Sequence, residues 1–308
     1  MTAPMARTVS VRAPGKVNAG LAVGALRADG YHTLETLLVA VSCYEEVTIT
    51  RAPSLKITVS GASDSQVPTD KSNLAAQAAA LLAQRCGIDP AVHIHIKKRI
   101  PLCGGMAGGS ADAAATLVGC DAMWNTRLGL SELTALAAKL GADVPFSLLG
   151  GAAIGRGRGD VLEPVGQVKP YHWVFATADA GLSTPAMFAA WDETREGTQA
   201  LSASAALPTD LLRAFASGDA RWLADELVND FEPLALDLRP SLLETRETGL
   251  RAGALAGILA GTGATYAFLA DSAAGARIVA GKLTASGVCA GAIVTQGPVA
   301  GPSIVTVE

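Results

Sequence analysis

The sequence predicts a protein of mixed helices and strands in two domains, and three observations support this. The chain has 308 residues, of which 50% are hydrophobic and 17% charged, enough for one large or two ordinary domains with apolar cores. Short alternating apolar runs are interspersed with amphipathic helical runs along its length. The pattern breaks between Pro164 and Pro170 and then restarts, so we place one domain at residues 1–165 and another at residues 166–308.

Composition argues against several classes of protein. A net charge of −4 gives no electrostatic reason to expect a nucleic-acid partner. Five cysteines are scattered without C-x-x-C pairs, which indicates neither a disulfide framework nor a zinc site and favours a reducing cytoplasm. Met1–Arg7 lacks the apolar core of a secretory signal. Residues 252–270 carry no charge but are mostly alanine and glycine, so we expect no membrane span there.

The first domain is predicted to begin with strands and turns. Ala13–Asn18 contains a Pro-Gly turn, whose lysine and asparagine are also compatible with ordinary loop polarity. A tight turn is predicted at Asp29-Gly30, within the segment Arg27–His32. Alternating apolar residues predict strands at Val9–Arg12, Leu37–Val41, Glu46–Thr50, Leu55–Val59 and Val92–Lys97.

Helices and a hairpin follow. Amphipathic spacing predicts helices at Ser72–Cys86, Ala111–Met123 and Ser131–Leu140. The first begins near Thr69 or Asp70 and ends at Gly87, and the third has Ser131 as its N-cap and Gly141 just past its end. Two apolar runs around a glycine-rich turn predict a hairpin of Leu149–Gly155 and Val161–Val165.

The second domain alternates helices and strands. Its expected helices are Pro185–Trp191, Asp210–Ser217, Arg221–Val228 and Arg239–Ala252. Its expected strands are His172–Ala176, Thr265–Leu269 and Ala292–Thr295. The glycine-rich turn Gly261–Ala264 is predicted to follow a helix and precede a strand, where its backbone can approach a ligand closely.

The stretch Pro101–Ala114 carries the clearest functional signal. Four glycines lie between a predicted strand and an alanine-rich helix, an order that forms phosphate cradles. Ser110 is placed to cap that helix, whose free N–H groups and dipole favour an anion. The loop is not a Walker A motif, and Cys103 occupies the first glycine position of G-x-G-x-x-G. A flexible surface loop is the alternative.

Three other features are open to two interpretations each. Asp143 lies between apolar residues directly after a helix, so it is either part of a structural cap or turn or a functional carboxylate. His93 and His95 lie on one face of a strand and could bind a metal, but without a third ligand a solvated face is favoured. Arg156 and Arg158 suggest a phosphate site, although an exposed hairpin tip is favoured.

The chain resembles the GHMP kinase superfamily of ATP-dependent small-molecule kinases. The segments that carry this resemblance are Ala13–Asn18, Pro101–Ala114, Gly141–Phe146 and Leu259–Ala264. Asp29–Leu34 and Asn229–Glu232 are similar to one branch, whose acceptor is a cytidine diphosphate-linked methylerythritol of the non-mevalonate isoprenoid pathway. Three positions depart from the family pattern: Cys103 and Ala107 stand where glycine is usual, and Ala111 where a small polar residue is common.

The resemblance implies an α+β fold of two domains with the active site in the cleft between them. It also implies transfer of the γ-phosphate of ATP to the 2-hydroxyl of the acceptor. Asp143 is the implied general base and Lys16 its electrostatic partner. Mg²⁺ is expected on the triphosphate, with Ser110 as its candidate protein ligand.

The remaining site residues also follow from the resemblance. The residues implied to bind ATP are Asn73, Lys98, Pro101, Leu102, Cys103, Gly104, Gly105, Met106, Ala107, Gly108, Gly109, Ser110 and Ala111. The residues implied to bind the acceptor are Asn18, Tyr31, His32, Thr184 and Phe188, with Tyr31 and His32 reading cytosine. We expect a cytoplasmic monomer or weak homodimer without a nucleic-acid or membrane partner. The alternatives are another kinase of the superfamily, acting on homoserine, mevalonate or a sugar, and a catalytically silent nucleotide-binding regulator.

Overall fold

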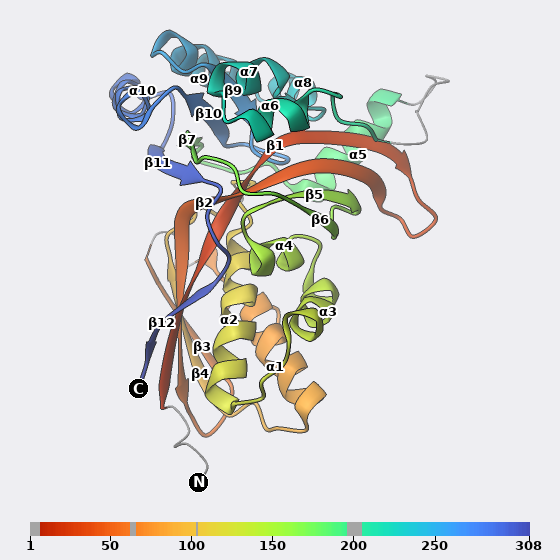
Figure 1. Cartoon of the computed structure of the whole chain (residues 1–308), viewed down its shortest axis with the longest axis vertical. Helices are drawn as coiled ribbons and strands as arrows, with labels where there is room; N and C mark the ends of the chain where they lie inside the picture. Colours follow the sequence, from red (N-terminus) through yellow and green to blue (C-terminus); the bar gives the residue numbers. More distant parts are fainter. Residues whose placement is uncertain (1–6, 62–65, 103, 196–204) are drawn as a thin grey trace.

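A computed structural model describes residues 7–61, 66–102, 104–195 and 205–308 (Figure 1). Within these residues the strands form one sheet of eight strands and one of four. The larger sheet has the order β12-β1-β2-β4-β3, with β5 and β8 attached to β2 and β1, and β6 attached to β5. Its strands are β1 (Thr8–Leu26), β2 (His32–Arg51), β3 (Lys56–Gly61), β4 (Val92–Lys98), β5 (Ala152–Gly157), β6 (Val161–Val165), β8 (Val228–Asn229) and β12 (Ser303–Val307).

β1 and β2 form a long antiparallel hairpin that reaches from the larger sheet toward the second half of the molecule (Figure 1). The prediction of a turn at Ala13–Asn18 was therefore wrong, as was the division of β2 into two strands. The chain stays extended there because the pairing shifts register at Pro14/Gly15 and again at Asn18/Gly20. Such irregularities accommodate a proline that cannot donate to a ladder. The predicted turn at Asp29-Gly30 is confirmed as the end of this hairpin.

Four helices of the first half cover one face of the larger sheet (Figure 1). They are α1 (Leu74–Cys86), α2 (Gly108–Trp124), α3 (Leu130–Leu140) and α4 (Val144–Leu149). The many alanines of α1 and α2 are buried in the core, where small side chains allow close packing. α4 was not predicted, because six residues with a proline give too little periodicity to recognise.

Several helix starts differ from prediction. α1 is capped by Asn73, whose side chain accepts from the N–H of Ala75, rather than by Thr69 or Asp70. α2 begins at Gly108 after Ala107, so Ser110 lies inside its first turn and the predicted capping role was wrong. α3 begins after Gly129, which places Ser131 within the helix. Each of these regions contains more than one residue with cap chemistry, and backbone geometry selects among them.

β4 has the predicted alternation. Val92, Ile94 and Ile96 are fully buried against the helices. On the other face His93 and His95 hydrogen-bond Thr58 and Ser60 of the neighbouring strand β3, so they are half-buried rather than solvated. The described residues contain no group of three metal-ligating side chains.

The smaller sheet is antiparallel, with the order β11-β7-β10-β9. Its strands are β7 (Tyr171–Thr177), β9 (Ala256–Leu259), β10 (Tyr266–Ala270) and β11 (Gly291–Gly297). The helices of this half are α5 (Thr184–Arg195), α6 (Leu211–Ser217), α7 (Ala220–Glu226), α8 (Glu232–Leu238), α9 (Ser241–Arg251) and α10 (Ala273–Ser286). Residues 252–270 hold β9, a turn and β10. No helix in the described part of the chain is long and apolar enough to cross a membrane.

Strands from the second half of the chain join the larger sheet of the first half. β12 and β8 both pair with β1, so residues beyond 166 contribute two strands to the larger sheet. One core cluster includes Val17 of β1 together with Trp173 and Phe175 of β7. The turn at Gly261 connects two strands, β9 and β10, and not a helix to a strand as predicted. The division at residue 165 remains a prediction.

Candidate active site

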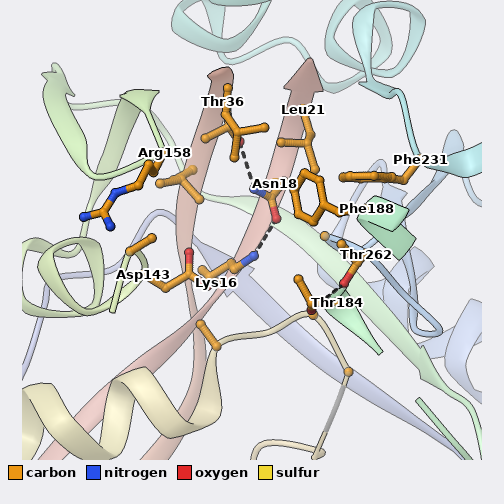
Figure 2. Close-up of a pocket in the computed structure, with 18 of the residues that line it drawn as sticks. Lys16, Asn18, Leu21, Thr36, Asp143, Arg158, Thr184, Phe188, Phe231 and Thr262 are labelled. Atoms are coloured by element: carbon orange, nitrogen blue, oxygen red, sulfur yellow. Dashed lines mark hydrogen bonds between the residues drawn. The ribbon is translucent and has the colours of Figure 1, made fainter. Parts of the chain in front are cut away.

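A cavity of about 420 Å³ lies where four parts of the chain meet (Figure 2). They are the β1–β2 hairpin, the segment Pro101–Gly109 (the glycine loop), the turn at Gly261 and α5. Of the predicted site residues, the following line it: Lys16, Asn18, Tyr31, His32, Pro101, Leu102, Gly104, Gly105, Ala107, Gly108, Gly109, Asp143, Thr184 and Phe188. The following do not line it: Asn73, Lys98, Met106, Ser110 and Ala111. Cys103 lies outside the described residues.

Lys16 is held by a chain of hydrogen bonds along β1 and β2. Its ammonium donates to Asn18 Oδ1 at 2.6 Å, and Asn18 Nδ2 donates to Thr36 Oγ1 at 2.8 Å (Figure 2). Thr36 in turn donates to the carbonyl of Gly20 at 2.7 Å. Lys16 is only 5% exposed, and its ammonium donates to a neutral amide. A nearly buried cation with a neutral partner favours an anion in the adjoining space.

Asp143 stands at the start of α4, directly after α3. Its carbonyl accepts from the N–H of Ser147 at 2.9 Å, but its side chain makes no capping hydrogen bond. Asp143 therefore lies in a turn at the N-cap position of α4, but its carboxylate takes no part in capping. The half-buried carboxylate lines the cavity that Lys16 also lines (Figure 2). Among the described residues, no ion pair joins these two groups, which leaves both available to a ligand.

The glycine loop is closely packed against the second half of the chain. Gly105 has a φ of 68°, and a Cβ there would lie 1.8 Å from the carbonyl oxygen of Ala260. Only glycine fits such a contact. At Gly108 a Cβ would lie 3.0 Å from Glu45 Oε1, so the first turn of α2 rests on a buried carboxylate. Ala107 holds the left-handed conformation with φ 59°, where the family usually has glycine.

Beneath the loop lies a buried group of three charges, Glu45, Lys98 and Asp112, which we call the charge cluster. The Lys98 ammonium is 2.6 Å from Glu45 Oε1 and 2.7 Å from Asp112 Oδ2, and all three side chains are between 0% and 4% exposed. Glu45 also accepts from the N–H groups of Arg99 and Ile100, at the start of the loop. The cluster thus joins the strand before the loop to the helix after it.

The charge cluster holds one excess carboxylate when both acids are ionised. Burial opposes this and raises the pKa of Asp112 to about 7, although Lys98 acts in the opposite direction. Burial likewise raises the pKa of Glu45. The two carboxylates raise the pKa of Lys98, against the effect of its burial. Asp112 Oδ1 is buried without a hydrogen-bond partner in the described structure.

Two of the residues implied to bind ATP, Asn73 and Lys98, use their side chains elsewhere. Asn73 caps α1 through its oxygen and donates to the carbonyl of Pro68 through its nitrogen. Lys98 belongs to the charge cluster. Sequence reasoning missed Glu45 and Asp112 as partners of Lys98. An aspartate inside an alanine-rich helix was the available signal, because a buried carboxylate requires a partner.

An aromatic group forms the opposite side of the cavity. His32 is 6% exposed; its ring stacks on Phe188 with centroids 5.0 Å apart, and its Nε2 is 2.8 Å from Asp192 Oδ1. Phe188 also meets the edge of Phe231 (Figure 2). Tyr31 is 53% exposed and lines the cavity mouth.

The segment Asn229–Glu232 holds the Gly261 turn and Phe231 in place beside the cavity. Asn229 Nδ2 donates to the carbonyls of Leu259 and Gly261 at 2.8 and 2.7 Å, and its oxygen accepts from the N–H of Phe231. The Gly261 turn is thereby fixed beside the ammonium of Lys16. Thr184 and Thr262 share a hydrogen bond of 2.9 Å at the cavity edge (Figure 2).

Arg158 lies at the tip of the predicted hairpin, but it is not exposed there as expected. The residue lies between β5 and β6, lines the cavity and has a side chain only 31% exposed (Figure 2). The pairing of β5 with β2 brings this turn beside the β1–β2 turn. Sequence reasoning could not place Arg158, because the pairing joins strands far apart in the chain.

An anion-favouring glycine loop, a nearly buried lysine and a free carboxylate in one cavity define a small-molecule phosphotransferase. Models of two families match the chain: the GHMP kinases N terminal domain over residues 73–151 and the GHMP kinases C terminal over residues 211–305. The chain belongs to the GHMP kinases and is a small-molecule kinase.

Curated relatives are similar over most of their length. A 4-diphosphocytidyl-2-C-methyl-D-erythritol kinase of Streptomyces avermitilis is 51% identical over 89% of this chain and 91% of its own. One of Nocardia farcinica is 47% identical over 97% of both chains. A crystal structure of 4-(cytidine 5'-diphospho)-2C-methyl-D-erythritol kinase superposes with a TM-score of 0.77 at 31% identity, covering 94% of this chain and 99% of that one. A crystal structure of L. major mevalonate kinase, 16% identical with a TM-score of 0.75 over 98% of this chain and 99% of its own, shares the fold alone.

Proposed function

We propose that the protein transfers the γ-phosphate of ATP to the 2-hydroxyl of 4-diphosphocytidyl-2-C-methyl-D-erythritol in the non-mevalonate isoprenoid pathway. The observation that carries this proposal is the meeting of Lys16, Asp143, the glycine loop and the Tyr31–His32 segment in one cavity. The names of relatives that are about half identical support the choice of acceptor.

Asp143 acts as the general base in this proposal. Its carboxylate accepts the proton of the acceptor hydroxyl while that oxygen forms a bond to the γ-phosphorus and the bond to the β-phosphate oxygen breaks, releasing ADP. A base of this kind contributes about 10²- to 10⁴-fold to the rate. Lys16, held by Asn18, neutralises charge on the phosphoryl group in transit, a task that suits a compact ammonium.

The glycine loop and the start of α2 hold the triphosphate. Backbone N–H groups of Gly104–Ser110 and the dipole of a 17-residue helix favour an anion there. The nucleotide base is then expected beside Pro101 and Leu102, which line the cavity. Any contact that Asn73 or Lys98 makes with the base uses the main chain, because both side chains are already paired.

The residues present fit a magnesium ion bound mainly by phosphate. The described chain offers no group of three acidic or histidine ligands. Magnesium on a nucleotide takes one or two protein ligands and fills its other positions with phosphate and water. Ser110, in the first turn of α2 beside the proposed triphosphate site, is the candidate protein ligand, although it does not itself line the cavity. When bound, the ion would neutralise part of the negative charge of the triphosphate.

A substrate panel tests the proposal against its rivals. Purified protein is mixed with ATP, Mg²⁺ and, in turn, the cytidine acceptor, its uridine analogue, mevalonate, homoserine and a sugar, and ADP release is measured. We expect release with the cytidine acceptor alone or far above the others. Preference for mevalonate, homoserine or a sugar would reassign the acceptor, and no release with any of them would favour a silent nucleotide-binding regulator.

A further inference from the structure

We propose that Arg158 is a positioning residue that fixes the ring of Tyr31 and so determines how tightly the acceptor binds. The inference rests on the proposed function only in that the acceptor contacts Tyr31. It deepens that function by assigning a role to a cavity residue that lies outside the motifs of the resemblance. Two observations carry it: how Arg158 is held, and what it touches.

Arg158 is held by one neighbouring carboxylate. Its Nε and Nη2 donate to Asp160 Oδ2 at 3.1 and 2.6 Å, and its backbone N–H donates to Asp160 Oδ1 at 3.2 Å. Asp160 is only 15% exposed, so this ion pair is partly shielded from water. The same acid fixes both the main chain and the guanidinium, which leaves the side chain little freedom. Arg158 is therefore a rigid part of the cavity wall.

The guanidinium lies over the ring of Tyr31, 4.9 Å from its centroid. Tyr31 is half exposed at the end of a hairpin turn, and its backbone N–H is held by Asp29. The side chain of a half-exposed tyrosine can change rotamer readily unless another side chain packs against one face of its ring. Arg158 supplies a flat cation for one face by cation–π contact, and leaves the other face for a planar group of the acceptor.

The neighbouring Arg156 offers a matched control. It lies in the same β5–β6 hairpin but pairs with Glu35 and Glu163, is 50% exposed and does not line the cavity. Arg156→Met removes an arginine from the same hairpin without touching Tyr31. Comparing it with Arg158→Met separates an effect on the cavity wall from a general loss of charge or of hairpin stability.

Steady-state kinetics of the full chain provide the first test. We expect Arg158→Met to raise the acceptor KM about threefold to thirtyfold, the range of a cation–π contact, with kcat and the KM for ATP unchanged. Arg158→Lys should recover only part of this, because an ammonium lacks the flat face. Asp160→Asn should give a smaller rise of the same kind. Arg156→Met should match the wild type, and circular dichroism checks that each variant is folded.

A double-substitution cycle with Tyr31→Ala decides whether Arg158 acts through Tyr31. In the Tyr31→Ala background, Arg158→Met should raise the acceptor KM no further. Independent, multiplying effects would overturn the proposal, because they would mean that Arg158 touches the acceptor directly. A wild-type acceptor KM in Arg158→Met would overturn it as well. The acceptor used is whichever one the wild type phosphorylates, so failure of the cytidine assignment is seen separately and leaves this test intact.

Discussion

The two sides of the cavity are built differently. The loop side, the glycine loop on its charge cluster, rests on three ionic side chains that are at most 4% exposed. The acceptor side, made of Tyr31, His32, Phe188 and Arg158, rests on ring contacts and on the carboxylates of Asp192 and Asp160, which are 46% and 15% exposed, while Tyr31 is 53% exposed. The loop side is thus part of the core, and the acceptor side is a surface assembly. Damage to the first should affect folding and nucleotide binding, whereas damage to the second should affect acceptor binding alone.

The largest effect is expected where the two sides meet, at Asp143. Asp143→Asn keeps the shape of the side chain but removes the proton acceptor. We expect kcat to fall by about 10²- to 10⁴-fold while both substrates still bind. Rapid-quench or coupled ADP assays give kcat, and calorimetric titration with a non-hydrolysable ATP analogue checks binding. Near wild-type turnover would show that another group takes the proton.

The next largest effect is expected on stability, from Lys98→Met. Removing the ammonium leaves two buried carboxylates without their partner, which costs about 3–5 kcal/mol of the free energy of unfolding. Lys97→Met is the matched control, because Lys97 directly precedes Lys98 in β4 and is exposed. Urea denaturation measures both. Equal stability of the two variants would mean that the charge cluster does not support the loop side.

The charge cluster also predicts a dependence of stability on pH. Burial raises the pKa of Asp112 from 3.8 to about 7, so the folded protein binds this proton more tightly than the unfolded chain. The resulting stabilisation is complete at low pH and is lost as the pH rises toward about 7, on the order of 1 kcal/mol per pH unit in between. Asp112→Asn should flatten this slope in denaturation curves measured across the window. An unchanged slope would assign the proton to another group.

On the acceptor side, a smaller effect is expected from His32→Ala. Cytosine and uracil exchange donor and acceptor positions, and each mismatched buried pair costs about 1–3 kcal/mol. The wild type should therefore prefer the cytidine to the uridine acceptor by at least about tenfold. His32→Ala should reduce this preference and raise the acceptor KM, with the KM for ATP unchanged. Competition between the two acceptors measures the ratio, and equal use of both by the wild type would show that cytosine is not read.

The sequence indicates the parts of the site whose chemistry is local. Glycines between a strand and a helix predicted the loop, and an aspartate among apolar residues after α3 predicted a cavity carboxylate. Features that depend on contacts between residues far apart in the sequence were not predicted. These are the uninterrupted β1–β2 hairpin, the salt bridges of Lys98 and the position of Arg158 at the cavity. Ser110 shows a third kind of error, because a good capping residue was chosen two residues inside a helix that begins on glycine.

The independence of the two sides can be measured most directly with one substitution on each and the KM of both substrates. Gly105→Ala places a methyl group against the carbonyl of Ala260 and distorts the loop. Arg158→Met releases Tyr31 on the other side. We expect Gly105→Ala to raise the KM for ATP and Arg158→Met to raise the KM for the acceptor, each leaving the other constant unchanged. A rise of both constants in either variant would contradict the separation of the cavity into two sides.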